Sequence, residues 1–230
     1  MIAGGFQKNS LIDFPKKIAS VIFTKGCNFK CPYCHNPELI SFEKDETVIK
    51  NEEIFSFLEK RRGFIDAVVI TGGEPLLQKD ITEFIRHIKE LGYPVKIDTN
   101  GSRPEVLEYL ISKNLVDLVA MDIKTVFENY SMISNEKDIK SKLENSVNTL
   151  MNSGIDHYFR TTCAPFFVSP QNADQVFSQI KGAKTLYLQK FKRKKVLDSA
   201  FFNDKKDLTD KDMEEIKTKA GKYVKNCIVF

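Results

Sequence analysis

The sequence has no tryptophan, and none of its apolar runs approaches the ~20 residues needed to cross a bilayer. Its first residues, Met1 to Lys8, lack the charged start, apolar core and cleavage site of a secretion signal. Only five cysteines are present, and three of them are clustered, which is not the pattern of a disulfide framework. These absences predict a protein of the reducing cytoplasm with no membrane partner.

The chain also has little excess charge of either sign. Its 35 Lys and Arg against 31 Asp and Glu give a formal net charge of +4. This is far from the strongly basic footprint of a dedicated nucleic-acid binder. The one dense basic run spans residues 190–195, and we expect either a solvated face or a docking site for an acidic partner.

What the sequence does contain is a regular alternation of short apolar segments with segments of helical periodicity. With 230 residues, the chain is long enough for one large α/β core. Such alternation indicates right-handed β-α-β units and a parallel sheet. The expected strands are residues 18–24, 67–71, 95–99, 116–123, 157–163 and 185–189.

Two closures of such a sheet are compatible with the alternation. An open doubly wound sheet would reverse the strand order partway, whereas a curved partial barrel keeps the strands in order. The polar motifs at the strand ends favour a partial (β/α)6 TIM-like barrel, because it gathers them over one mouth. We expect this barrel in residues 1–195 and a C-terminal helical extension packed on it in residues 196–230. Thr209 and Asp212 predict a capping box for the helix of the extension.

Three cysteines follow the first expected strand in C-x3-C-x2-C spacing: Cys27, Cys31 and Cys34. This places them on a loop at the carboxyl end of a strand, where α/β folds usually carry their chemistry. Thiolates hold iron–sulfur clusters, and a cubane held by three of them leaves one iron open. A zinc site with a fourth Cys or His ligand is an alternative, and three ordinary buried thiols are another. His35, Cys163 or Cys227 would supply the fourth ligand of a zinc site; otherwise Cys163 is expected to be a buried thiol and Cys227 a buried or edge-strand thiol.

The spacing C-x3-C-x-aromatic-C, with Tyr33 as the aromatic residue, resembles the signature loop of the radical S-adenosylmethionine (SAM) enzymes. A second element of that family, Gly72-Gly73-Glu74-Pro75, follows the second expected strand. The resemblance implies that the three thiolates hold a [4Fe–4S] cluster and that SAM chelates the fourth iron. Reduction of the cluster then cleaves SAM to methionine and a 5′-deoxyadenosyl radical. The same resemblance implies the partial (β/α)6 barrel.

Later strand ends resemble those of the glycyl-radical-enzyme activases. Asp98-Thr99-Asn100-Gly101 and Asp122-Ile123-Lys124 are similar to segments of the pyruvate formate-lyase activating enzymes. There, such Asp residues bind a monovalent cation beside SAM, and the Lys contacts the carboxylate of SAM. We carry these roles onto Asp98, Asp122 and Lys124, with strand-end caps and surface charge as the alternative.

Other residues complete the expected SAM site. The family uses the Gly-Gly segment to bond the amino group of SAM, and Glu74 either contacts SAM or fixes the loop. Arg160 lies in an apolar strand, so inside a barrel it needs a carboxylate partner, from SAM or from a neighbouring Asp. Gln189 ends the last expected strand, which family members place near the adenine. The expected cofactor contacts are Tyr33, Gly72, Gly73, Glu74, Asp98, Thr99, Asn100, Asp122, Lys124, Arg160 and Gln189.

The segment Ser10-Leu-Ile-Asp-Phe-Pro15, with His35-Asn-Pro-Glu-Leu39, resembles the anaerobic ribonucleoside-triphosphate reductase activating proteins. Lys16 stands where those proteins often have Gly. The resemblance implies an enzyme that generates a glycyl radical on a partner, most closely that reductase, with a flavodoxin- or ferredoxin-type electron donor. The alternatives are a radical SAM enzyme that acts on a small molecule or RNA, and a zinc-binding interaction module.

Overall fold

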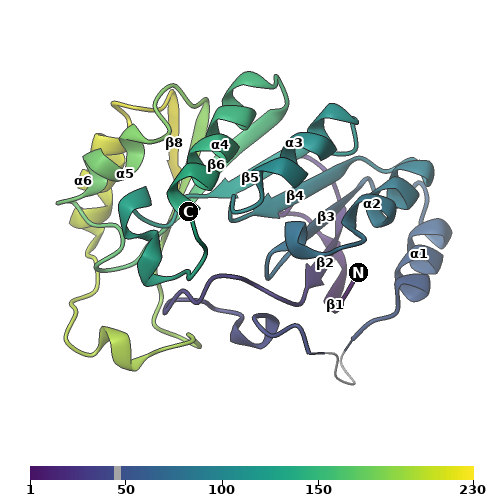
Figure 1. The fold of residues 1–230 in the computed structure, drawn as a ribbon, viewed down its shortest axis with the longest axis horizontal. Coiled ribbons are helices and arrows are strands. Elements are labelled where there is room, and N and C mark those ends of the chain that lie inside the picture. The colour runs from purple at the N-terminus through teal and green to yellow at the C-terminus, as the bar shows by residue number, and fades with distance from the viewer. Residues whose placement is uncertain (44–47) are drawn as a thin grey trace. The chain divides into compact units, whose positions relative to one another are not determined.

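The computed structural model describes residues 1–43 and 48–230, in which strands alternate with helices along the chain (Figure 1). The strands in this part are β1 (Ala3–Ser10), β2 (Ala19–Thr24), β3 (Ala67–Gly72), β4 (Val95–Thr99), β5 (Leu118–Asp122), β6 (Asp156–Cys163), β7 (Thr185–Lys190) and β8 (Asn226–Val229). The α-helices are α1 (Asn51–Lys60), α2 (Ile81–Glu90), α3 (Pro104–Ser112), α4 (Ile139–Asn152), α5 (Ala173–Ser178) and α6 (Asp210–Ala220).

The chain forms two compact units whose segments interleave in the sequence. The first unit comprises residues 1–28, 38–99 and 103–119, and the second comprises residues 29–37, 100–102 and 120–230. One boundary falls inside the cysteine loop. Cys27 therefore belongs to the first unit, whereas Cys31 and Cys34 belong to the second.

In the first unit, β1 to β4 are neighbours in chain order. The pairing of β1 with β2 is antiparallel, and the pairings of β2 with β3 and of β3 with β4 are parallel. The register of β2 on β3 is unbroken from Ala19 opposite Ala67 to Thr24 opposite Gly72. Both strands are apolar and β-branched along most of their length, as parallel strands covered on both faces usually are.

Helix α2 shows how the sequence fixes a helix in this unit. Ile81, Phe84, Ile85 and Ile88 recur at helical spacing, are all buried, and form the face that packs toward β4. Gly92 follows the helix with a φ of +90°, a conformation that glycine adopts at little cost and that leads the chain out of the helix.

In the second unit, β6, β7 and β8 are parallel neighbours, again in chain order. β5 contributes Ala120–Asp122 to this unit, and the N–H of Ile123 just after it donates to the carbonyl of Arg160 at 2.8 Å. Helices α5 and α6 pack on each other, and α6 packs on β8, as the yellow end of the ribbon in Figure 1 shows.

The six strands expected from the sequence are confirmed as β2 to β7, with ends that differ by at most two residues. Strands β1 and β8 were not among them. β1 carries two glycines and a polar second half, and β8 is only four residues long, so neither has a strong apolar signal. The extension thus contains a strand as well as its helix, and its status as a separate domain stays a prediction. The capping box of Thr209 and Asp212 is confirmed.

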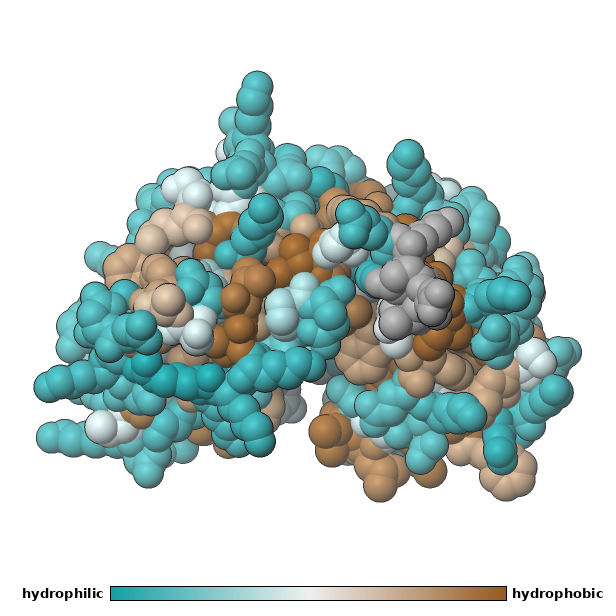
Figure 2. Space-filling view, turned by 90° about the horizontal axis from the view of Figure 1, so that it is seen from below, coloured by the Kyte–Doolittle hydropathy of each residue, from teal (hydrophilic) through white to brown (hydrophobic). Residues whose placement is uncertain are grey.

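The surface in Figure 2 is mainly hydrophilic, with separate hydrophobic areas. Among the large apolar side chains, Ile12, Leu11 and Phe64 are the most exposed, at 90%, 76% and 71%. Leu11 and Ile12 lie in the connection between β1 and β2, so this connection presents apolar side chains outward. In residues 1–43 and 48–230, every helix is too short or too polar to cross a membrane.

Candidate functional site

In the first unit, the end of β3 is bonded to the end of β2 and the residues that follow it. The N–H of Gly73 donates to the carbonyl of Thr24, and the N–H of Glu74 donates to the carbonyl of Gly26, each at 2.8 Å. A Cβ on Gly73 would lie 2.2 Å from the Gly26 oxygen, and one on Gly72 would lie 2.4 Å from the Thr24 nitrogen. Gly72 also has a φ of +111°. The two glycines are therefore required for this backbone contact, whatever else they bind.

The start of the cysteine loop is also held by residues that follow the loop in the sequence. The N–H of Gly26 donates to the carbonyl of Leu39 at 2.7 Å, and the N–H of Cys27 donates to the carbonyl of Ile40 at 3.0 Å. These bonds fix the backbone of Cys27, while the residue stays partly exposed.

Glu74 joins the ends of two strands in the same unit. Its side chain is completely buried, and its Oε1 accepts hydrogen bonds from the Leu76 N–H at 3.1 Å and from the Thr99 hydroxyl at 2.8 Å. Burial of a carboxylate is costly unless such donors compensate it. Glu74 thus fixes the loop, which is one of the two roles expected from the sequence.

Asp98, one residue before the end of β4, forms an ion pair that sequence reasoning missed. Its Oδ1 lies 2.7 Å from the Nζ of Lys96, and the two side chains are only 6% and 1% exposed. The Lys96 ammonium also donates to the carbonyl of Asp13 at 2.7 Å. The signal for this pair was present, because residues two apart in a strand share a face.

In the second unit, Cys31 and Cys34 are joined by a tight turn, in which the Cys34 N–H donates to the Cys31 carbonyl at 2.9 Å. Burial raises the pKa of the Cys31 thiol to about 11, although the positive charge of Lys124 opposes the shift. Metal binding needs the thiolate, so a metal bound by Cys31 must displace its proton. Tyr33 between them is buried with its ring edge-on to Phe167 at 5.0 Å, and burial raises its pKa well above the usual value.

The segment after the basic run supports this half of the cysteine loop. The N–H of Leu197 donates to the carbonyl of Cys34, and the N–H of Asp198 donates to the carbonyl of Pro32, each at 3.0 Å. Sequence reasoning could not find these bonds, because any residue except proline can supply a backbone N–H.

Asp122 lies in a charged group in which cations outnumber carboxylates. The Nε of Arg160 donates to its Oδ1 at 2.9 Å, and the Nζ of Lys124 lies 3.4 Å from its Oδ2. Burial alone would raise the pKa of Asp122, but the two cations lower it below the usual value. Burial alone would lower the pKa of Lys124, but the negative charge of Asp122 helps hold that pKa well above the usual value. Two cations beside one carboxylate can accept another anionic group, such as the carboxylate of an amino acid.

The remaining expected contacts have simpler surroundings. Asn100 is buried in the second unit, and its Oδ1 accepts from the Ser102 N–H at 2.9 Å in a local turn. Gln189 on β7 is exposed. The structure therefore gives Asn100 a turn-forming role, and contact of Gln189 with an adenine stays a prediction.

All five cysteines are free thiols. Burial raises the pKa of Cys163 to about 12 and that of Cys227 to about 11, so both stay protonated near neutral pH. Among the residues that the structure describes, no three Cys, His, Asp or Glu side chains are already arranged around a metal position. The ligand set of the cluster therefore stays a prediction.

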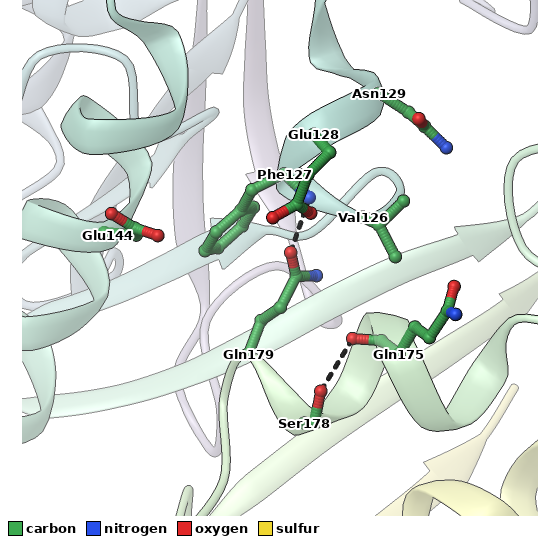
Figure 3. A pocket seen from close by; sticks show the side chains of 8 residues that line it. All are labelled: Val126, Phe127, Glu128, Asn129, Glu144, Gln175, Ser178 and Gln179. Atoms are coloured by element: carbon green, nitrogen blue, oxygen red, sulfur yellow. Dashed lines mark hydrogen bonds between the residues drawn. The ribbon is translucent and has the colours of Figure 1, made fainter.

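A pocket of about 540 Å³ lies in the second unit, and its lining includes none of the cofactor contacts expected from the sequence (Figure 3). Its lining comes from α4, α5 and the 3-10 helix that spans residues 127–132. The Gln179 side chain accepts from the Phe127 N–H and donates to the Val176 carbonyl, so it joins these elements. Because its amide already has these structural partners, we assign the pocket no ligand.

Comparisons with known proteins agree with the motifs. A model of the radical SAM superfamily matches residues 21–175. A protein of Methanocaldococcus jannaschii with the provisional name glycyl-radical enzyme activating enzyme is 37% identical over 99% of this chain and 95% of its own length. A protein of Saccharolobus islandicus provisionally named GTP 3′,8-cyclase is 27% identical over 75% of this chain and 54% of its own length.

Solved structures share the fold. SuiB of Streptococcus suis bound to S-adenosylmethionine superposes with a TM-score of 0.65, at 14% identity over 91% of this chain and 49% of its own. TYW1 with a lysine-pyruvate adduct superposes with a TM-score of 0.61, at 13% identity over 90% of this chain and 74% of its own. With the family match, these likenesses confirm the prediction of a partial barrel of the radical SAM type.

Gly73→Ala tests the backbone contact at the end of β3. The added methyl would meet the Gly26 carbonyl at 2.2 Å, so the loop that carries Cys27 must shift. We expect a loss of about 1–3 kcal/mol of stability and less iron retained after anaerobic reconstitution. Gly221→Ala is the matched control, because its φ is −61° and its new Cβ would make ordinary contacts at 3.5 Å. Full iron retention in Gly73→Ala would contradict the assignment.

Leu197→Pro tests the support of Cys34 from the segment after the basic run. Proline has no N–H, so the bond to the Cys34 carbonyl is lost, which costs about 0.5–1.5 kcal/mol. We expect a bound cluster to bleach faster in the presence of an iron chelator. Leu197→Ala keeps the N–H and should behave like the wild type. Equal bleaching rates in the two variants would show that this bond does not support the loop.

Proposed function

The chain belongs to the radical SAM superfamily, and on that premise we propose that it activates a glycyl-radical enzyme. The observation that carries the proposal is the 37% identity to the Methanocaldococcus jannaschii protein, because the two chains match over nearly their whole lengths. The match to the Saccharolobus protein covers only 54% of that protein, so a GTP cyclase activity has weaker support. Membership of the superfamily implies a [4Fe–4S] cluster and SAM, which argues against a zinc-binding interaction module.

We propose that Cys27, Cys31 and Cys34 hold the cluster. Three thiols within eight residues of one loop are a suitable donor set, and a fourth ligand from the chain is not needed, because SAM takes the open iron. Cys163 and Cys227 lie on β6 and β8, outside the cysteine loop, which supports their exclusion. When bound, the cluster supplies the electron that cleaves SAM.

We propose that SAM is held by groups from several strand ends. The backbone after β3 bonds its amino group, and Lys124 and Arg160 bind its carboxylate, which suits the excess positive charge around Asp122. The other contacts proposed are Tyr33, Gly72, Gly73, Glu74, Asp98, Thr99, Asn100 and Gln189. The 5′-deoxyadenosyl radical would then take a hydrogen atom from a glycine Cα of the partner, giving 5′-deoxyadenosine and a glycyl radical.

The partner that we propose is an anaerobic ribonucleoside-triphosphate reductase, supplied with electrons by a flavodoxin- or ferredoxin-type donor. The support is the similarity of residues 10–15 and 35–39 to activating proteins of that reductase. Glycine is a reasonable target, because without a side chain its backbone can approach a reactive centre closely. Oxygen-sensitive cofactors and five free thiols fit the reducing cytoplasm as the compartment.

The test is electron paramagnetic resonance on an anaerobic mixture of the reduced, cluster-loaded protein, SAM and each glycyl-radical enzyme of the source organism. We expect a doublet whose splitting collapses when the glycine α-hydrogen is replaced by deuterium. Cys34→Ala should abolish the cluster colour and the signal, whereas Cys163→Ala should keep both. Turnover of a small molecule or RNA, with no glycyl signal from any partner, would replace the activase proposal with that alternative.

Asp122→Ala tests the SAM site separately. Without the carboxylate, Arg160 and Lys124 repel each other and lose their common partner. A lost charge-assisted contact is worth about 1.5–3 kcal/mol, so SAM affinity should fall about ten- to a hundred-fold with the iron content unchanged. Asp210→Ala is the control, since it removes an exposed carboxylate that also pairs with a lysine. Unchanged affinity in Asp122→Ala would exclude Asp122 from the site.

A further inference from the structure

The ion pair of Lys96 with Asp98 carries an inference beyond the proposed function. Lys96 is the second residue of β4 and is 1% exposed, a rare position for a lysine. A buried ammonium is strongly unfavourable unless oxygens surround it. Two oxygens lie 2.7 Å from its Nζ, the Oδ1 of Asp98 and the carbonyl oxygen of Asp13, and both belong to the same unit as Lys96.

This lysine bears on the monovalent cation implied for Asp98 by the resemblance to activases. An alkali ion needs the carboxylate oxygens of Asp98, and the ammonium already forms an ion pair with one of them at 2.7 Å. A second cation in the same buried place would be repelled by the first. The residues present therefore do not fit an alkali ion at Asp98.

The second carboxylate shows the same arrangement in its own unit. Asp122, for which the same cation was expected, pairs with Arg160 at 2.9 Å and with Lys124 at 3.4 Å. Asp98 and Asp122 are thus both neutralised by lysine or arginine side chains of this protein.

We propose that the Lys96 ammonium is the permanent counter-ion of Asp98, so that this protein binds SAM without an alkali-metal ion. The proposal rests on the SAM site proposed above. Lys96 is a positioning residue in it: the ammonium neutralises Asp98 at the carboxyl end of β4. Through the Asp13 carbonyl it also ties β4 to the connection between β1 and β2, which presents the exposed Leu11 and Ile12.

The first measurement is the affinity of the anaerobic, cluster-loaded wild type for SAM, by calorimetry in sodium, potassium or choline chloride at equal ionic strength. We expect dissociation constants that agree within about twofold. A saturable gain of tenfold or more with sodium or potassium over choline would overturn the proposal. Absence of SAM binding in every salt would instead count against the proposed function, so the two failures are distinguishable.

The second measurement needs neither SAM nor cluster. Lys96→Met leaves Asp98 buried without this cation, so we expect the Tm of the apoprotein to fall by roughly 6–20 °C. Asp98→Asn should also lower it, whereas the double variant should recover much of the loss, because both charges are then gone. In Lys96→Met, potassium chloride should raise the Tm above its value in choline chloride, because an ion can take the vacated place.

Additive Tm losses in the double variant, or a Tm of Lys96→Met equal to that of the wild type, would overturn the proposal. Lys89→Met is the matched control, because Lys89 makes an ion pair of the same length with Asp117 but is 27% exposed. Its Tm should change little, and it should not depend on the salt. If Lys96→Met fails to fold, the double variant and the salt series on the wild type still decide the question.

Discussion

In the first unit, the backbone just after β3 lies against the end of β2 and the residues that follow it. The positions of Cys27 and Glu74 depend on this contact. Two backbone hydrogen bonds of 2.8 Å join Gly73 and Glu74 to Thr24 and Gly26, and they leave no room for a Cβ on Gly73. The same approach brings Glu74 into a buried position, where it accepts from the Thr99 hydroxyl. One backbone contact therefore sets both the start of the cysteine loop and the joint between the ends of β3 and β4.

In each unit, the carboxylate near a strand end forms ion pairs with side chains of the same unit. Asp98 is paired with Lys96 in the first unit, and Asp122 is paired with Arg160 and Lys124 in the second. Buried ion pairs contribute little net stability, since desolvation offsets the attraction, but removal of one partner is costly. Their value here is geometric: Lys96 holds Asp98 from the same strand, and Arg160 on β6 holds the partly buried Asp122 at the end of β5.

The sequence was sufficient for features that depend on residue type, such as β2 to β7, the capping box and the double glycine. It was not sufficient for β1, whose glycines and polar residues give no strand signal, although its pairing with β2 places it in the sheet. The Lys96 pair was readable from strand alternation, because the charged residues Lys96 and Asp98 stand two apart in an otherwise apolar segment. The hydrogen bonds from Leu197 and Asp198 could not be predicted from the sequence, because every residue except proline has a backbone N–H.

The backbone hydrogen bonds from Leu197 and Asp198 show that the C-terminal segment contacts the cysteine loop. Residues 197 and 198 lie in the part of the chain expected to be an extension, yet they hold the carbonyls of Pro32 and Cys34. The position of Cys34 in the cysteine loop therefore depends in part on a backbone contact from the expected extension. The basic run at residues 190–195 precedes Leu197 with only Val196 between them. The basic run is thus continuous in sequence with a segment whose backbone bonds to the cysteine loop.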